Sequence, residues 1–166
     1  MTEDEAREWI RASYGVPRET QLAAFVELLR EEAAKQNLIA PSTLDQVWAR
    51  HIVDSAQLLA HAPDDGVWLD IGSGAGLPGL VVGLLPDAPV VLVEPRKLRT
   101  DFLSRVVVEL GLSNVVVHTD KIERTKGAAS VISARAVAQL PDLFRIAAHR
   151  STSSTVWVLP KGRNAQ

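Results

Sequence analysis

The sequence predicts an α/β fold in which a mostly parallel sheet is preceded by a helical extension. From residue 67 onward, short apolar segments alternate with segments of helical periodicity, a pattern typical of β-α-β units. The apolar segments contain few polar residues, as do strands that are buried on both faces of a parallel sheet. With 166 residues, of which 46% are hydrophobic, the chain is long enough to form one domain with a sizeable core.

Residues 1–62 are expected to form the helical extension. A short helix is predicted over residues 3–13. The next helix, over residues 20–36, has apolar residues spaced three and four apart, as an amphipathic helix does; they are Leu22, Phe25, Val26, Leu29 and Ala33. A third helix follows, with Ser42 or Thr43 as its N-cap. Its apolar face comprises Leu44, Val47, Trp48, His51, Ile52, Ser55, Leu58 and Leu59.

Residues 63–166 are expected to form the core domain. The five candidate strands are residues 67–71, 90–94, 115–118, 130–133 and 155–159. Helical segments are expected near residues 78–85, 97–110 and 139–149.

The charge of the chain is unevenly distributed. Residues 1–95 carry 6 lysines and arginines against 15 aspartates and glutamates, whereas residues 96–166 carry 12 against 5. A basic half favours contact with a polyanion through one face, although an ordinary solvated surface explains the same segregation.

Composition excludes several classes of site. The chain has no cysteine, which excludes disulfides, thiolate metal ligands and a cysteine nucleophile, and we expect no metal site. The N-terminus is acidic and lacks an apolar signal region, and no apolar run approaches ~20 residues. We therefore expect a cytoplasmic protein that does not contact a membrane.

The loop after the first strand is a candidate nucleotide-binding site. Gly72, Gly74 and Gly76 would let backbone N–H groups approach a ligand, because no Cβ intervenes. The match to G-x-G-x-x-G is weak by itself. The preceding Asp70 would repel the pyrophosphate of a dinucleotide, whereas it would hold a cationic amine directly or through water. This combination favours S-adenosylmethionine as the cofactor.

Two further strand ends are expected to contribute to the same site, since adjacent strand ends of an open α/β sheet converge on one crevice. Glu94 ends the second strand and would accept the ribose hydroxyls, a role that it would also serve for NAD. After the third strand, Ile122 would form part of an apolar wall for the adenine. Glu123 in the same loop is equally well explained as a solvated charge. An NAD(P)-linked oxidoreductase therefore stays open as an alternative.

Five separated motifs together resemble one known family. They are the segment 70–79, Asn37-Leu38, the segment 50–55, Ser133-Ala134-Arg135-Ala136 and Pro160-Lys161-Gly162. In this order, over about residues 20–163, they are similar to the bacterial 16S rRNA guanine-N7 methyltransferase family RsmG (GidB). The resemblance implies a class I S-adenosylmethionine-dependent methyltransferase with a Rossmann-like fold. It implies cofactor contacts at Gly72, Leu77, Ile122, Glu123 and Arg135, with Glu94 at the ribose.

The chain departs from the family pattern at two places. Ile39 follows Asn37-Leu38 where the family commonly has Thr, so a hydroxyl role there is absent. The family also continues beyond the Lys-Gly motif, usually with the last antiparallel strands, whereas this sequence ends at Gln166. We therefore expect those C-terminal strands to be missing and the strand 155–159 to be an exposed apolar edge.

The expected reaction needs no general base, because guanine N7 has a free lone pair and no proton. Catalysis is then a matter of positioning and charge placement. Arg135 is the expected positioning residue, and it could bind guanine O6, a flanking phosphate or the cofactor carboxylate. The expected partner is 16S rRNA or the small ribosomal subunit, bound by a monomer. A non-catalytic RNA-binding module with the same fold is a second alternative.

The remaining candidate residues have two interpretations each. Arg96, Lys97, Arg99 and Lys161 are predicted to bind RNA phosphates, but solvated charges would look the same. His51 and Asp54 lie three positions apart on the predicted third helix. Either they belong to the edge of the core, or their helix is a lid over the cofactor crevice.

Overall fold

The computed structural model describes residues 1–63, 65–86, 88–135 and 139–159. Its centre is a five-stranded sheet in the order β3-β2-β1-β4-β5, and all neighbouring strands are parallel. The strands are β1 (Trp68–Ile71), β2 (Val90–Glu94), β3 (Val115–Thr119), β4 (Val131–Ala134) and β5 (Val156–Val158). The chain reverses its winding direction between β3 and β4, so the carboxyl ends of β1 and β4 flank the point where such sheets bind ligands. All five predicted strands are confirmed within one or two residues.

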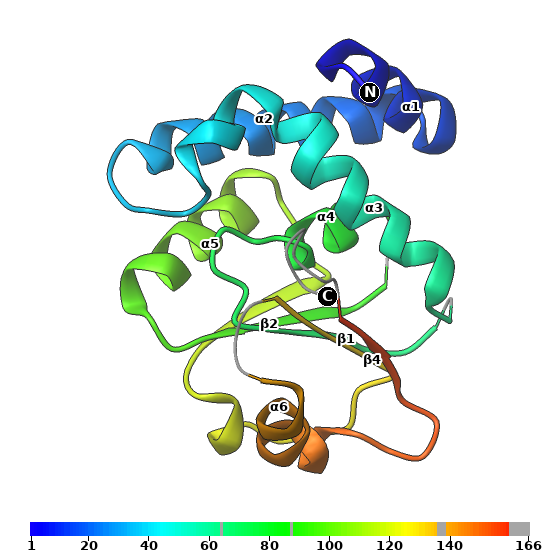
Figure 1. Cartoon of the computed structure of the whole chain (residues 1–166), viewed down its shortest axis with the longest axis vertical. Coiled ribbons are helices and arrows are strands. Elements are labelled where there is room, and N and C mark those ends of the chain that lie inside the picture. The colour runs from blue at the N-terminus through cyan, green and yellow to red at the C-terminus, as the bar shows by residue number, and fades with distance from the viewer. Residues whose placement is uncertain (64, 87, 136–138, 160–166) are drawn as a thin grey trace.

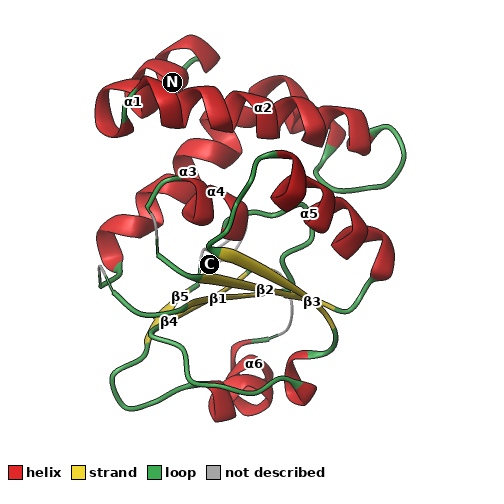
Figure 2. Cartoon of the chain, turned by 180° about the vertical axis from the view of Figure 1, so that it is seen from behind, coloured by secondary structure: helices red, strands yellow, loops and turns green. Residues whose placement is uncertain are grey.

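Helices cover the two faces of the sheet unequally (Figures 1 and 2). The helices α4 (Gly79–Leu84) and α5 (Lys97–Glu109) pack on one face, and α2 (Val16–Ala33) packs across them with α1 (Glu3–Tyr14) beside it. The helix α6 (Leu140–Ala147) lies on the opposite face. The predicted helical segments are confirmed for these five elements.

Helix α1 illustrates how local sequence sets an element boundary. The Thr2 hydroxyl accepts a hydrogen bond from the Glu5 N–H (3.1 Å), and the Glu5 carboxylate accepts one from the Thr2 N–H (2.8 Å). This capping box satisfies two of the N–H groups at the helix start that have no intrahelical partner.

The predicted third helix is wrong as one regular helix. The segment is divided into a 3-10 turn η1 (Pro41–Gln46), a π-helical turn η2 (Trp48–Ile52), a short α3 (Val53–Gln57) and a 3-10 turn η3 (Leu58–His61). The Glu3 carboxylate of α1 accepts hydrogen bonds from the N–H groups of Trp48 and Ala49, at 3.1 and 2.8 Å. These two donors are therefore satisfied by a distant side chain instead of by the preceding turn, which interrupts the helix.

Two apolar clusters hold the layers together. The larger one joins α1, α2 and the segment 47–56 to α4, α5 and the inner face of the sheet. Leu22, Phe25, Val26 and Leu29 of the predicted stripe are all buried in it. The smaller one lies between the sheet and α6 and includes Leu69, Ile132 and Leu143. Residues on both sides of the predicted boundary at 62/63 thus share one cluster, and the division into two units stays a prediction.

The strand β5 lies at the edge of the sheet, beside β4 alone among the described strands. Its apolar side chains are partly covered: Trp157 packs edge-to-face on Phe144 of α6, with ring centroids 4.9 Å apart. Phe144 and Leu140 are themselves 41% and 47% exposed. The edge is therefore apolar, as expected, with one face covered by α6.

The shared core generates a prediction about folding. Leu22 of α2 is fully buried, whereas Leu98 of α5 is 70% exposed. We expect Leu22→Ala to lower the free energy of unfolding by about 2–5 kcal/mol in a single transition, since it leaves a cavity in a core that both segments share. The matched change Leu98→Ala should alter the free energy of unfolding by less than about 0.5 kcal/mol. Urea denaturation followed by circular dichroism measures both, and a separate early transition in the Leu22 variant would contradict a shared core.

Candidate cofactor site

The glycine loop connects β1 to α4 and bends sharply because several of its residues have positive φ. Gly72, Gly74 and Gly76 have φ of 69°, 52° and 88°, values that favour glycine. A Cβ on Gly76 would lie 2.4 Å from Leu80 Cδ1, so this glycine also permits close packing on α4. A Cβ on Gly74 would meet no other atom within 3.4 Å. Gly74 thus has room beside it, on the side where the loop lines a cavity.

Asp70 lies beneath this loop. Its side chain is 1% exposed, and its two carboxylate oxygens accept hydrogen bonds from the Gly79 N–H (3.1 Å) and the Ser133 hydroxyl (2.8 Å). Because successive side chains alternate along a strand, Asp70 and Trp68 point toward α4, and Asp70 does not line the cavity. In this structure the Asp70 carboxylate binds the N-terminus of α4 and the neighbouring strand, and its contact with a ligand amine, directly or through water, stays a prediction.

The contacts of Asp70 continue through the core. The Trp68 indole N–H donates to the Ser133 hydroxyl oxygen (2.8 Å), and that hydroxyl donates to Asp70. Burial raises the pKa of Asp70 to about 6, although the hydrogen bonds from Ser133 and Gly79 act in the opposite direction.

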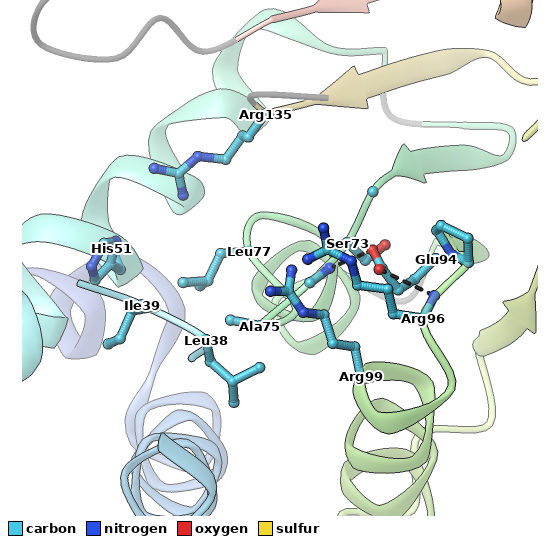
Figure 3. Close-up of a pocket in the computed structure, with 13 residues that line it drawn as sticks. Leu38, Ile39, His51, Ser73, Ala75, Leu77, Glu94, Arg96, Arg99 and Arg135 are labelled. Atoms are coloured by element: carbon cyan, nitrogen blue, oxygen red, sulfur yellow. Dashed lines mark hydrogen bonds between the residues drawn. The ribbon is translucent and has the colours of Figure 1, made fainter. Parts of the chain in front are cut away.

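A cavity of about 450 Å³ opens at the carboxyl ends of β1, β2 and β4 (Figure 3). Its size is within the ordinary range of small-molecule sites, about 300–1,000 Å³. It is lined by Leu38, Ile39, His51, Gly72, Ser73, Gly74, Ala75, Leu77, Glu94, Pro95, Arg96, Arg99 and Arg135. Sequence reasoning placed Gly72, Gly74, Leu77, Glu94 and Arg135 at a cofactor site, and the structure brings these five together.

Glu94 links the second strand to the glycine loop. Its side chain is 4% exposed, and its carboxylate accepts hydrogen bonds from the N–H groups of Gly74 and Arg96, both at 3.3 Å (Figure 3). These contacts hold the carboxylate at the wall of the cavity.

Three arginines give the cavity an excess of positive charge. Arg96 and Arg99 come from the start of α5, and Arg135 follows β4 across the cavity. One Arg99 nitrogen donates to the Asn37 carbonyl (3.2 Å), which ties α5 to the loop after α2. Lys97 does not line the cavity, since it forms an ion pair with Asp101 on the exposed side of α5. Of the basic residues predicted near the start of α5, Arg96 and Arg99 therefore line the cavity and Lys97 does not.

His51 lies in the cavity wall with a defined tautomer. The Thr43 hydroxyl donates to the Ala40 carbonyl (2.8 Å), so its oxygen receives the N–H of His51 Nε2 (2.9 Å). The unprotonated Nδ1 is buried without a hydrogen-bond partner among the described residues. Burial, with the Arg135 charge next, lowers the pKa of His51, while the exposed Asp54 opposes this. The ring is therefore neutral at pH 7, and Asp54 does not line the cavity.

Three other predicted residues lie elsewhere. Gly76 lies behind the loop, against α4. Ile122 is buried in the cluster on the α6 side, and Glu123 is exposed, so neither lines the cavity. The short turn η4 (Ile122–Arg124) packs against α6 and turns the Ile122 side chain toward it, and a contact of Ile122 with the adenine stays a prediction. Lys161 lies outside the described residues.

Reasoning from the residues missed two apolar lining residues, Leu38 and Ile39. They come from the irregular segment between α2 and η1, where no periodicity marks a function. The signal that could have found them is the Asn37-Leu38 motif, which entered only through the family resemblance.

Comparison with known proteins identifies the family. A family model described as GidB, rRNA small subunit methyltransferase G, matches residues 18–166. The chain belongs to this family. The ribosomal RNA small subunit methyltransferase G of Sphingopyxis alaskensis is 52% identical over an alignment covering 96% of this chain and 71% of that relative. The corresponding protein of Erythrobacter litoralis is 46% identical over 99% of this chain and 81% of its own length.

Solved structures agree with the fold of this GidB family member. A geranyl diphosphate C-methyltransferase from Streptomyces coelicolor, in complex with S-adenosyl-L-homocysteine, superposes with a TM-score of 0.56 at 22% identity over 64% of this chain and 43% of that one. A precorrin-6y C5,15-methyltransferase from Geobacter metallireducens gives 0.55 at 16% identity over 75% and 65% of the two chains. This confirms the class I methyltransferase fold.

The cavity fits the cofactor of this family, S-adenosylmethionine. Gly74 leaves open the space that a Cβ would begin to fill, and Glu94 offers a carboxylate to paired hydroxyls. The arginines offer donors for the carboxylate of an amino acid. Among the described residues no group of three potential ligands could hold a metal ion. No helix in the described ranges has the length and apolar character of a membrane span.

The burial of Asp70 generates a prediction about pH. Its folded pKa of about 6 exceeds the reference value of 3.8, so the folded state binds the proton more tightly. The stabilisation by protonation is therefore complete below pH 3.8 and is lost as the pH rises through 6. We expect Asp70 to lower the free energy of unfolding by about 2 kcal/mol between pH 4 and 7. In Asp70→Asn the side chain is neutral at every pH, so the variant should lose this part of the pH dependence of the free energy of unfolding.

Urea denaturation at several pH values tests the prediction, with Asp101→Asn as the control because Asp101 is exposed. The difference between wild type and the Asp70 variant should change with pH, whereas that of the control should not. Parallel pH profiles for wild type and Asp70→Asn would contradict the assignment.

Proposed function

We propose that this protein transfers the methyl group of S-adenosylmethionine to N7 of a guanine in 16S rRNA of the small ribosomal subunit. One observation supports this proposal above all. In a member of the GidB family, the glycine loop, Glu94 and three arginines line the same cavity. The names of the relatives support ribosomal RNA of the small subunit as the substrate. The guanine N7 position rests on the motif resemblance.

The residues around the cavity divide the binding of the cofactor between them. Glu94, fixed by the N–H groups of Gly74 and Arg96, is suited to accept hydrogen bonds from the two ribose hydroxyls. Arg135, on the opposite wall, is suited to the amino-acid carboxylate or to the guanine. Leu38, Ile39 and Leu77 supply the apolar surface that excludes water from the reacting atoms.

The chemistry matches the groups present. S-adenosylmethionine, when bound, supplies an electrophilic methyl group. Because guanine N7 attacks through its own lone pair, the enzyme has no proton to remove. Asp70 is buried below the loop, and the Nδ1 lone pair of neutral His51 is also buried, so neither is exposed to the substrate as a base. Positioning by Arg135 and exclusion of water then supply the catalysis.

The arginines at the rim support binding of a polyanion. Arg96 is exposed and Arg99 is partly exposed at the mouth of the cavity, and both belong to the basic half of the chain. Phosphate contacts of this kind weaken steeply as the salt concentration rises. The proposal extends to Lys97 and Lys161 as RNA contacts, and to Ile122 and Glu123 as cofactor contacts.

The proposal also includes the location of the protein in the cell, its oligomeric state and the segment that covers the cavity. A ribosomal RNA substrate supports action in the cytoplasm. We also propose that the protein binds its substrate as a monomer. His51 and Asp54 are proposed as part of the segment that covers the cavity.

The decisive experiment measures binding and transfer separately. Calorimetry with S-adenosylhomocysteine and with NAD should show binding of the former alone. Incubation with labelled S-adenosylmethionine and small subunits from a strain that lacks the enzyme should yield N7-methylguanine in 16S rRNA by mass mapping. Binding of NAD alone would favour an oxidoreductase, and cofactor binding without transfer to free rRNA or subunits would favour a non-catalytic module.

Removal of the Arg135 guanidinium should affect transfer selectively. We expect Arg135→Ala to lower the rate of methyl transfer on the order of 100-fold, because the reacting atoms lose a positioning contact. The control Arg145→Ala removes the same charge from the exposed side of α6 and should leave the rate unchanged. Wild-type activity in the Arg135 variant would refute its role.

Substitution of Gly74 tests whether the glycine loop binds the cofactor, with Gly111 as the matched control. A Cβ on Gly74 would lie 3.5 Å from Arg99 Nη1 and 3.7 Å from the Gly72 carbonyl oxygen, and Gly111 also has a positive φ (63°) with nothing within 4 Å. Gly74→Val and Gly111→Val therefore introduce similar backbone strain at different places. We expect only the Gly74 variant to lose affinity for S-adenosylhomocysteine, at least tenfold, or about 1.4 kcal/mol. Equal losses in calorimetry would mean that the effect comes from strain.

A further inference from the structure

A second crevice lies on the face of the sheet that α6 covers, near the edge strand β3. Its volume is about 370 Å³. It is lined by Val91, His118, Thr119, Asp120, Arg124, Thr125, Lys126 and Arg150. The segment after β3 forms one wall as it runs down to lie beside α6 (Figure 2). The crevice shares no lining residue with the cofactor cavity.

The floor of this crevice contains a buried guanidinium without a counter-charge. Arg150 is 3% exposed, and it donates from Nε to the Gly127 carbonyl and from Nη1 to the Thr125 hydroxyl oxygen. In the described ranges 1–63, 65–86, 88–135 and 139–159, no carboxylate forms an ion pair with it. Burying a charge is costly unless an opposite charge accompanies it. The protein's own carbonyl and hydroxyl groups orient Arg150 but leave its charge uncompensated.

The rest of the guanidinium is available to a ligand. Within the described structure Nη2 has no acceptor, and it lies beside Gly127, where a Cβ would be 3.9 Å away. The absence of a side chain at Gly127 keeps this approach open. An arginine whose other donors are fixed presents its free N–H groups in a defined direction, which suits the oxygens of a phosphate.

The surrounding charges favour an anion. Arg124 and Lys126 are both exposed at the rim, and neither forms an ion pair within the described part of the chain. The single acidic residue in the lining is Asp120, whose carboxylate accepts a hydrogen bond from the Lys121 N–H (2.8 Å). Three cations against one carboxylate give the crevice a net positive charge.

We propose that this crevice binds a phosphate group, with Arg150 at the floor and Arg124 and Lys126 at the rim. The phosphate can belong to a free anion or to the backbone of RNA. Binding of the phosphate itself does not depend on the proposed function, whereas RNA as its source rests on it. If RNA is the source, the protein contacts its substrate both at the mouth of the cofactor cavity and at this crevice.

A nuclear magnetic resonance titration tests the site directly. Inorganic phosphate is added to the ¹⁵N-labelled protein in saturating S-adenosylhomocysteine, so that the cofactor cavity is already filled. We expect the amide signals of residues 118–127 and 149–150 to shift and saturate. The exposed double change Arg124→Ala with Lys126→Ala should weaken binding at least fivefold, whereas Arg145→Ala, with the same kind of charge loss on exposed α6, should change it less than twofold.

A second arm identifies the source of the phosphate. A single-stranded RNA of about ten nucleotides replaces phosphate in the titration. Shifts in the same amides, weakened by the same double change, support RNA, and shifts with phosphate alone support a free anion. The proposal is overturned if phosphate moves only amides around the first cavity, or if the double variant binds as wild type does. If S-adenosylhomocysteine does not bind, the proposed function fails, but these amides still report on the crevice.

Discussion

The structure around the site depends on the hydrogen bonds of one buried carboxylate. Asp70 joins the end of β1 to the first N–H of α4 through Gly79 and to β4 through Ser133. The glycine loop is the segment between the two ends that Asp70 holds, so its shape follows from these contacts. A Cβ on Gly79 would lie 2.6 Å from the Asp70 carboxylate, which shows how closely helix and strand approach. Asp70, which indicated a ligand site in the sequence, therefore holds the backbone on either side of the loop that lines this site.

A second carboxylate, that of Glu94, lines the cavity, which Asp70 does not. Glu94 accepts N–H groups from the glycine loop and from the start of α5, and this fixes the two elements on either side of the cavity. The cations around it come from parts of the chain far apart in sequence: Arg96 precedes α5, Arg99 lies in its first turn, and Arg135 follows β4. One fixed carboxylate among three arginines provides distinct places for hydroxyl groups and for anions. Both are needed by an enzyme that binds a nucleoside cofactor and an RNA.

The helical extension is part of the site. Leu38, Ile39 and His51 line the cavity, and the segment that carries them is held in place by Glu3 of α1 and by Thr43. Glu3 accepts the first two N–H groups of the π-helical turn that contains His51. The first helix of the chain thus binds the segment that forms a wall of the cavity, although no residue of this helix lines the cavity.

The sequence by itself determined the strands, the order of helices and strands, the glycine loop and the position of Glu94. These are local properties, since apolar runs, helical periodicity and glycine content act on neighbouring residues. Only the tertiary structure decided that Asp70 lies under the loop, that Ile122 points toward α6 and that the third helix is interrupted. Each of these depends on a partner distant in sequence: Ser133 for Asp70, the α6 cluster for Ile122, and Glu3 for Trp48 and Ala49. A pattern along the chain indicates which residues are apolar or charged, but the packed fold decides which face each side chain meets.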